Sequence, residues 1–116
     1  MDERDYQAMN KDMESENIFK QAVDKFGVEN QLLKLVEEMA ELTQSIIKRK
    51  LNNYEPEYLE NLIEEFVDVN LVLSQLSYSE LFKSKKSKEL FSKYYLEKTK
   101  YLESLLKTQN ETKVEN

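Results

Sequence analysis

Two pairs of carboxylate residues in this chain have a spacing that suits metal chemistry. Glu38 and Glu41 form the first pair, and Glu65 and Asp68 form the second. An α-helix turns about 100° per residue, so residues three positions apart lie on one helical face. Ligand sets made only of oxygen atoms select hard divalent cations. The two pairs therefore predict a Mg²⁺ site, with Mn²⁺ or Ca²⁺ as alternative ions.

Each pair lies beside a stripe of apolar residues. On a helix, the stripe falls to one side of Glu38 or Glu65, and the second carboxylate lies about 60° to the other side. We expect the two helices to pack as an antiparallel hairpin, with the four carboxylates face to face at a partly buried edge. Such a cluster is repulsive, so either a cation binds or a pKa rises. The stripes consist of Leu35, Met39, Leu42 and Ile46 in the first segment and Leu62, Phe66 and Val69 in the second.

Long helices are the elements that must position these residues. The chain has one glycine and one proline, too few for the many tight turns of a β-sandwich. We predict an all-α fold, a helical bundle of about four helices in a single domain over residues 1–116, with polar, flexible ends at 1–13 and 109–116. Because a small domain buries a modest fraction of its surface, we expect oligomerisation to complete the core. The expected helices run from near Ser15 to Phe26, Val28 to Lys50, Pro56 to Leu76 and Glu89 to Leu106, with a break at 77–79.

Composition excludes several classes of function. The net charge of −6 argues against nucleic-acid binding, which needs basic residues to neutralise phosphates. The absence of Cys excludes disulfides and thiolate chemistry, and the absence of His removes the usual general base. The charged start of the chain does not resemble a signal peptide, and no run of about 20 apolar residues suggests a membrane span. We therefore expect a cytoplasmic protein without a membrane partner.

The acidic motifs and their flanking residues resemble the MazG-like nucleoside triphosphate pyrophosphohydrolases, an all-α family. The resemblance covers residues 26–76. Residues 26–32 and 36–42 look like the first motif helix of small phage-type members, 63–69 look like the second, and 74–76 also fit.

The resemblance implies a reaction and a ligand set. It implies cleavage of a nucleoside triphosphate between its α and β phosphates, giving a monophosphate and pyrophosphate, as part of nucleotide-pool cleaning. It implies Mg²⁺ held by the positions matching Glu38, Glu41, Glu65 and Asp68. It also implies a homodimer or homotetramer whose helices form a composite bundle.

Other polar residues are candidates for the remaining roles. With no His in the chain, Glu37 or Glu64 could accept a proton, although each could equally be a solvated surface charge. Gln31 and Lys34 lie on the same helical face as Glu38 and could reach a nucleotide or phosphate, or they could be ordinary polar surface residues. Lys93 and Lys100 are candidates for substrate binding, and residues 48–50 and 83–88 are candidates for screening pyrophosphate. Tyr54, Tyr94 and Tyr95 are candidates for base stacking. All of these could instead be ordinary surface or core residues.

The main rival interpretation is a non-catalytic helical module that binds a partner or a nucleotide. In that case the acidic pairs are only solvated surface. A di-iron carboxylate bundle is disfavoured because such sites normally carry Glu-x-x-His motifs. A membrane-surface helix is disfavoured because the basic residues do not gather opposite a strongly apolar face.

Overall fold

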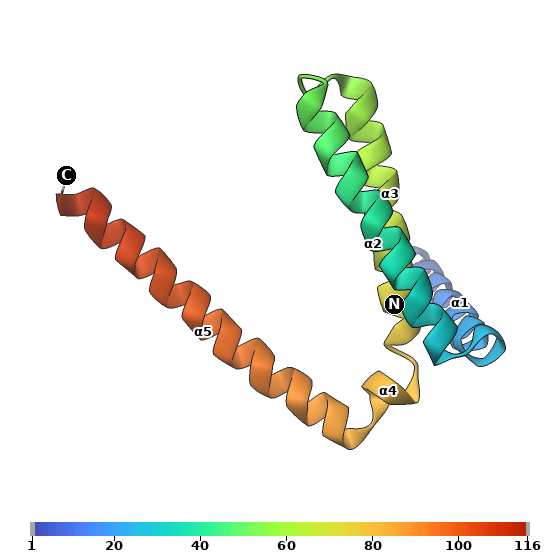
Figure 1. Ribbon diagram of the computed structural model, residues 1–116. Helices are drawn as coiled ribbons and strands as arrows, with labels where there is room; N and C mark the ends of the chain where they lie inside the picture. Colours follow the sequence, from blue (N-terminus) through green and yellow to red (C-terminus); the bar gives the residue numbers. More distant parts are fainter. Residues whose placement is uncertain (1, 116) are drawn as a thin grey trace. The chain divides into compact units, whose positions relative to one another are not determined.

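The chain is all-helical in the residues that the structure describes. A computed structural model describes the backbone of residues 2–115 and the side chains of residues 2–4 and 14–108, and it contains no strand in this range. The all-α prediction is therefore confirmed. The five helices are α1 (Glu3–Phe26), α2 (Val28–Leu51), α3 (Pro56–Leu76), α4 (Glu80–Lys83) and α5 (Lys85–Glu115) (Figure 1).

The chain divides into two compact units, Met1–Phe82 and Lys83–Asn116, and each is described by itself. The first unit contains α1, α2 and α3, and the second consists mainly of α5. This division does not test the prediction of a single domain, which stays a prediction.

The central helices begin and end where local sequence signals predict. Gly27 separates α1 from α2 with φ 82°, and Pro56 occupies the first turn of α3. Between α2 and α3, Asn53 and Tyr54 adopt positive φ angles of 56° and 60°. The Arg49 guanidinium lies 5.0 Å from the centre of the Tyr54 ring and supports this turn. The predicted break at residues 77–79 is confirmed as well.

The outer helices are longer than the sequence patterns predict. Helix α1 begins at Glu3 rather than near Ser15, and α5 runs from Lys85 to Glu115 rather than from Glu89 to Leu106. The added segments contain no Gly or Pro and consist largely of residues with good helix propensity, which apolar periodicity alone does not detect. The predicted flexibility of residues 1–13 and 109–116 falls largely outside the described side chains and stays a prediction.

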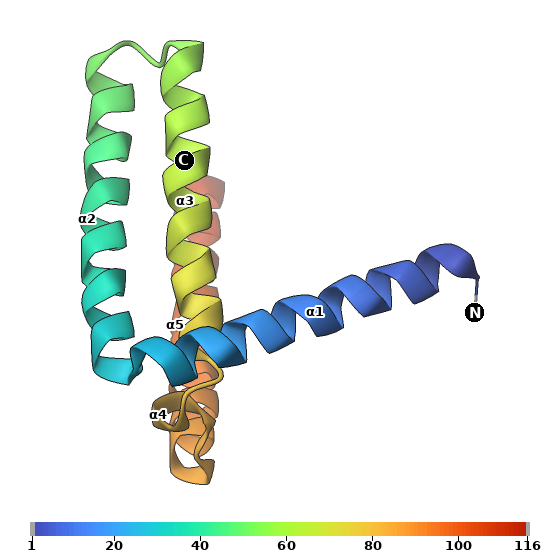
Figure 2. The same cartoon turned by 90° about the vertical axis from the view of Figure 1, so that its right-hand side faces the viewer.

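Helices α2 and α3 form an antiparallel hairpin, and the C-terminal part of α1 crosses its open end (Figure 2). The buried apolar residues of this unit come from α1 and from the second half of α3. Leu76 is only 2% exposed, so it is the centre of this small core. The core residues are Val23, Val69, Val72 and Leu76.

The contact between α2 and α3 is more polar than the apolar stripes predict. Gln31, Glu38 and Ser45 of α2 are all buried. The Ser45 hydroxyl donates a hydrogen bond of 2.8 Å to Asn61 Oδ1 of α3, so this polar residue links the two helices directly. Glu38 is more deeply buried than the expected partly buried edge, because it lies inside the contact with 6% of its surface exposed, whereas Glu65 and Asp68 are of intermediate exposure.

Part of the apolar stripe points away from the hairpin contact. Met39 and Ile46 are 51% and 53% exposed, so the expectation that they pack between the two helices is wrong for a single chain. The α2 residues that face α3 lie within about 60° of Glu38 on the helix, whereas Met39 and Ile46 follow it by about 80–100°. In an antiparallel pair of helices, equal rotations about the two helix axes lead to the same side of the pair. Residues of α3 that lie about 80–100° beyond Glu65 are therefore on the same side of the hairpin as Met39 and Ile46.

One side of the hairpin is consequently apolar and exposed, and we call it the apolar face. Its members are each between 47% and 65% exposed. Exposed apolar surface of this extent is typical of a region that another protein surface covers. The apolar face consists of Val36, Met39, Ile46 and Ile47 of α2 and Leu59, Ile63, Phe66, Val67 and Leu73 of α3.

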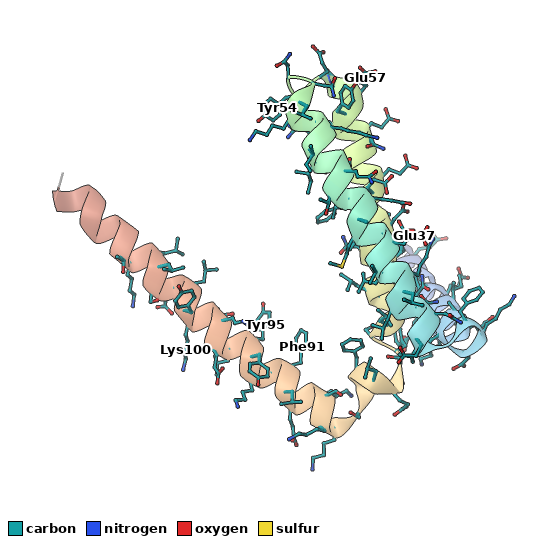
Figure 3. The ribbon with its side chains drawn as sticks, in the orientation of Figure 1. Glu37, Tyr54, Glu57, Phe91, Tyr95 and Lys100 are labelled. Atoms are coloured by element: carbon teal, nitrogen blue, oxygen red, sulfur yellow. The ribbon has the colours of Figure 1, made fainter. Side chains whose placement is uncertain are left out.

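Helix α5 also carries an apolar stripe. The rings of Phe91 and Tyr95 stack with their centres 5.9 Å apart (Figure 3). The stripe occupies an arc of about 160° on the helix, and its residues are each between 37% and 67% exposed. They are Leu90, Phe91, Tyr94, Tyr95, Tyr101, Leu102, Leu105 and Leu106. Within the described residues, no helix is both long enough and apolar enough to cross a bilayer.

Replacing Gly27 by alanine is expected to destabilise the first unit. Gly27 has φ 82° and ψ 152°, a backbone conformation that essentially only glycine adopts. A Cβ atom there meets no neighbour within 4 Å, so the cost comes from backbone strain, about 1–3 kcal/mol in the free energy of unfolding. Urea denaturation followed by circular dichroism measures the change.

Asn53→Gly is the control and should change stability little, because both residues tolerate the left-handed region. Equal stability of the wild type and Gly27→Ala would show that alanine at this position does not strain the backbone.

Candidate metal centre

The four carboxylates predicted as metal ligands converge in the middle of the hairpin. Glu38 and Glu41 come from α2, and Glu65 and Asp68 come from α3. One carboxylate oxygen from each lies within 4.8 Å of the corresponding oxygens of the others. We call these four residues the acidic cluster. Four oxygen ligands at this separation could hold a divalent cation.

Two buried oxygen atoms of the cluster lack a protein partner. Within the described part of the chain, Glu38 Oε2 and Glu65 Oε2 are buried and accept no hydrogen bond. Glu38 is 6% exposed, and Glu65 and Asp68 are of intermediate exposure. A buried, unpaired carboxylate oxygen is costly, because it has lost water without gaining a donor or a cation. This arrangement favours a bound cation over an ordinary solvated surface.

Charge repulsion inside the cluster affects the pKa of Glu41. The negative charge of Glu38 raises the pKa of Glu41 above its usual range, together with a loss of hydration and the charge of Glu65. A divalent cation at the cluster would remove the cause of this shift.

One positive side chain partly compensates the cluster. Lys34 Nζ lies 2.9 Å from Glu38 Oε1 and 3.7 Å from Glu37 Oε1. The hydrogen bond to Glu38 and the charges of both glutamates raise the pKa of Lys34. This contact engages the Oε1 atom of Glu38, so the unpaired Oε2 atom stays available.

Glu37 lies on the outer surface of α2, outside the acidic cluster (Figure 3). Its side chain is 60% exposed, and its nearest charged partner is Lys34. The role of Glu37 as a general base therefore stays a prediction.

A pocket of about 520 Å³ lies beside the cluster along the same helices. Gln31 is 4% exposed, and its Oε1 atom has no hydrogen-bond partner among the described residues. Lys34 belongs to the pocket wall and also contacts Glu38, so the pocket and the cluster adjoin. The lining residues are Lys25, Phe26, Asn30, Gln31, Lys34, Val72 and Gln75.

The structure brings together only some of the predicted substrate residues. Gln31 and Lys34 share the pocket wall, whereas Lys93 and Lys100 belong to the second unit. Lys93 Nζ lies 5.3 Å from the centre of the Tyr94 ring. The substrate roles of Lys93 and Lys100 stay predictions.

Sequence reasoning did not select Gln75 as a site residue, although a signal was present. Gln75 follows Asp68 by seven positions, which is about two helical turns, just as Glu38 follows Gln31. Residues with this spacing lie on one face, so each helix carries an amide that lines the pocket on the same face as its carboxylates.

Comparisons with protein-family models, with curated proteins and with solved structures found no match to this chain.

Proposed function

We propose that this chain is a Mg²⁺-dependent nucleoside triphosphate pyrophosphohydrolase. The observation that carries the proposal is the convergence of four carboxylates, two of which, Glu38 and Glu65, each have a buried oxygen without a hydrogen-bond partner among the described residues. The adjoining pocket supports it, because a volume of about 520 Å³ lies in the range of small-molecule sites. The resemblance of the acidic motifs to the MazG-like family favours the same reaction and a role in nucleotide-pool cleaning.

The acidic cluster would hold the metal through Glu38, Glu41, Glu65 and Asp68. A bound Mg²⁺ ion would neutralise the triphosphate and lower the pKa of a water molecule. In the reaction, the water oxygen would form a bond to one of the two phosphorus atoms that flank the α–β bridging oxygen, while the bond from that phosphorus to the bridging oxygen breaks. The bridging oxygen would leave with the other phosphate group, so that the products are a monophosphate and pyrophosphate, and a carboxylate would accept the proton of the water. Glu37 and Glu64 are the candidates for this acceptor, and a metal ligand such as Glu41 could share the role.

The pocket would hold the nucleoside. Phe26 and Val72 supply apolar contact for a base, and the free Gln31 Oε1 accepts a hydrogen bond from a ligand N–H group. Lys34 lines the pocket and contacts Glu38 of the cluster. The phosphates of a ligand that extends from the pocket to the cluster would therefore lie beside its ammonium.

A second copy of the chain would cover the apolar face of the hairpin. A two-helix hairpin leaves that face without another layer, and a face of one chain can meet the same face of another through a two-fold axis. The assembly would be a homodimer or a homotetramer, and sedimentation equilibrium measures its mass against 13.9 kDa for one chain.

The test of the function is a panel of ribo- and deoxyribonucleoside triphosphates, incubated with and without Mg²⁺ and analysed by chromatography. Metal-dependent release of monophosphate and pyrophosphate is the expected result, and the order of rates identifies the preferred base and sugar. Release of diphosphate and orthophosphate would contradict the proposed cleavage between the α and β phosphates. Mg²⁺ and nucleotide binding without products would favour the alternative, a nucleotide-binding module without catalytic activity.

A further inference from the structure

Lys34 is the residue at which the acidic cluster and the pocket meet. Its ammonium lies 2.9 Å from Glu38 Oε1, and the same side chain lines the pocket. The ammonium therefore has two possible anionic partners, the carboxylate of Glu38 on one side and an anionic ligand in the pocket on the other.

The two members of the ion pair differ in their freedom to move. The Glu38 side chain is 8% exposed and held in the contact between α2 and α3, whereas the Lys34 side chain is 50% exposed. Lysine carries its charge on a flexible four-carbon chain. When the pair separates, Lys34 moves and Glu38 stays.

A divalent cation at the cluster would weaken the contact of Lys34 with Glu38. Lys34 contacts Oε1 and the unpaired Oε2 is open to the cation, so two positive charges would share one carboxylate and repel each other. Binding of a cation therefore releases the ammonium toward the pocket, where it gains an anion as its partner. By thermodynamic linkage, an anion that holds Lys34 in the pocket must in turn favour cation binding.

We infer that Lys34 balances part of the charge of the acidic cluster whenever no divalent cation is bound, and that it couples the binding of a divalent cation to the binding of a phosphate-bearing ligand in the pocket. This inference rests on the proposed function and adds to it a role for one residue that is not a metal ligand. The coupling makes each ligand bind more tightly in the presence of the other.

The test compares wild type, Lys34→Met and Lys34→Gln by isothermal titration calorimetry with Mn²⁺ and with inorganic tripolyphosphate. Without Lys34, Mn²⁺ alone is expected to bind about five-fold more tightly, since the competing ion pair is gone. At saturating Mn²⁺, tripolyphosphate is expected to bind about five-fold more weakly, since its ammonium partner is gone. A purely structural role for Lys34 cannot produce these opposite changes.

Lys20→Met is the matched control. Lys20 lies in α1, forms an ion pair of the same spacing with Glu16 at 3.2 Å, and belongs neither to the acidic cluster nor to the pocket wall. The variant removes the same charge and should change neither affinity. Circular dichroism checks that each variant is helical, and the glutamine variant keeps a polar group if the methionine variant folds poorly.

The outcomes separate the inference from the function on which it rests. If wild type binds Mn²⁺ and both Lys34 variants bind it equally or more weakly, the coupling by Lys34 is overturned while the metal site stands. If wild type binds no Mn²⁺ at millimolar concentration, the metal site, the proposed function and the inference all fail.

Discussion

Replacing Glu38 by glutamine is expected to lower metal-dependent turnover by a factor on the order of 10² or more. Replacing a residue that only orients a metal ligand typically lowers metal affinity or activity by about 10–100-fold, and Glu38 is itself a proposed ligand. The neutral amide also removes the charge that a hard cation needs at the most buried position of the acidic cluster. Initial rates with saturating Mg²⁺ measure the loss, and circular dichroism should show unchanged helicity.

The same variant should abolish stabilisation by Mg²⁺. A cation that binds only the folded state raises its stability, so the wild-type melting temperature should rise with Mg²⁺ concentration and that of Glu38→Gln should not. The effect in the wild type should shrink as the pH falls, because protons compete with the cation for the carboxylates. Since the pKa of Glu41 is raised, this loss should begin at a higher pH than for an ordinary glutamate.

Glu29→Gln is the control for this experiment. Glu29 lies in the first turn of α2, is exposed and is remote in sequence from the cluster. It should keep both the turnover and the response to Mg²⁺. Unchanged turnover in Glu38→Gln and in Asp68→Asn would refute the assignment of the metal ligands.

Replacing Leu76 by alanine is expected to destabilise the first unit by about 2–5 kcal/mol. Leu76 is 2% exposed, and the apolar core around it is small. Truncation removes its burial and leaves a cavity, and the few neighbouring core residues cannot fill that space. Because small domains are stable by only about 5–15 kcal/mol, the loss is a large part of the total.

Urea denaturation measures this loss from the shift in the transition midpoint. Leu51→Ala is the matched control, since Leu51 ends α2 and is 75% exposed. It removes the same atoms from a solvated position and should cost far less. Similar losses in both variants would mean that Leu76 is not the centre of the core.

The central helices could be predicted from the sequence because their limits depend on single residues. Gly27 needs a conformation that other residues avoid, and Pro56 fits only the first turn of a helix. The ends of α1 and α5 have no such residues, so their lengths depend on summed helix propensity and could not be predicted from apolar spacing.

The ligands of the candidate site could be predicted because residues three apart on a helix share a face. Their surroundings could not, because burial depends on how α2 and α3 are rotated against each other. That rotation places Glu38, rather than the neighbouring Met39, inside the contact. The pairing of Lys34 with Glu38 follows from helical spacing, but its importance appears only once Glu38 is known to be buried.

The loop between α2 and α3 is short, and this has a consequence for the rate of folding. All four carboxylates lie between residues 38 and 68 of one hairpin, so the contacts that bring them together have low sequence separation and can form early. Repulsion between the two helices would then be present already in the transition state. A divalent cation that relieves it should therefore accelerate refolding more than it slows unfolding, and stopped-flow measurements of both rates with and without Mg²⁺ test this.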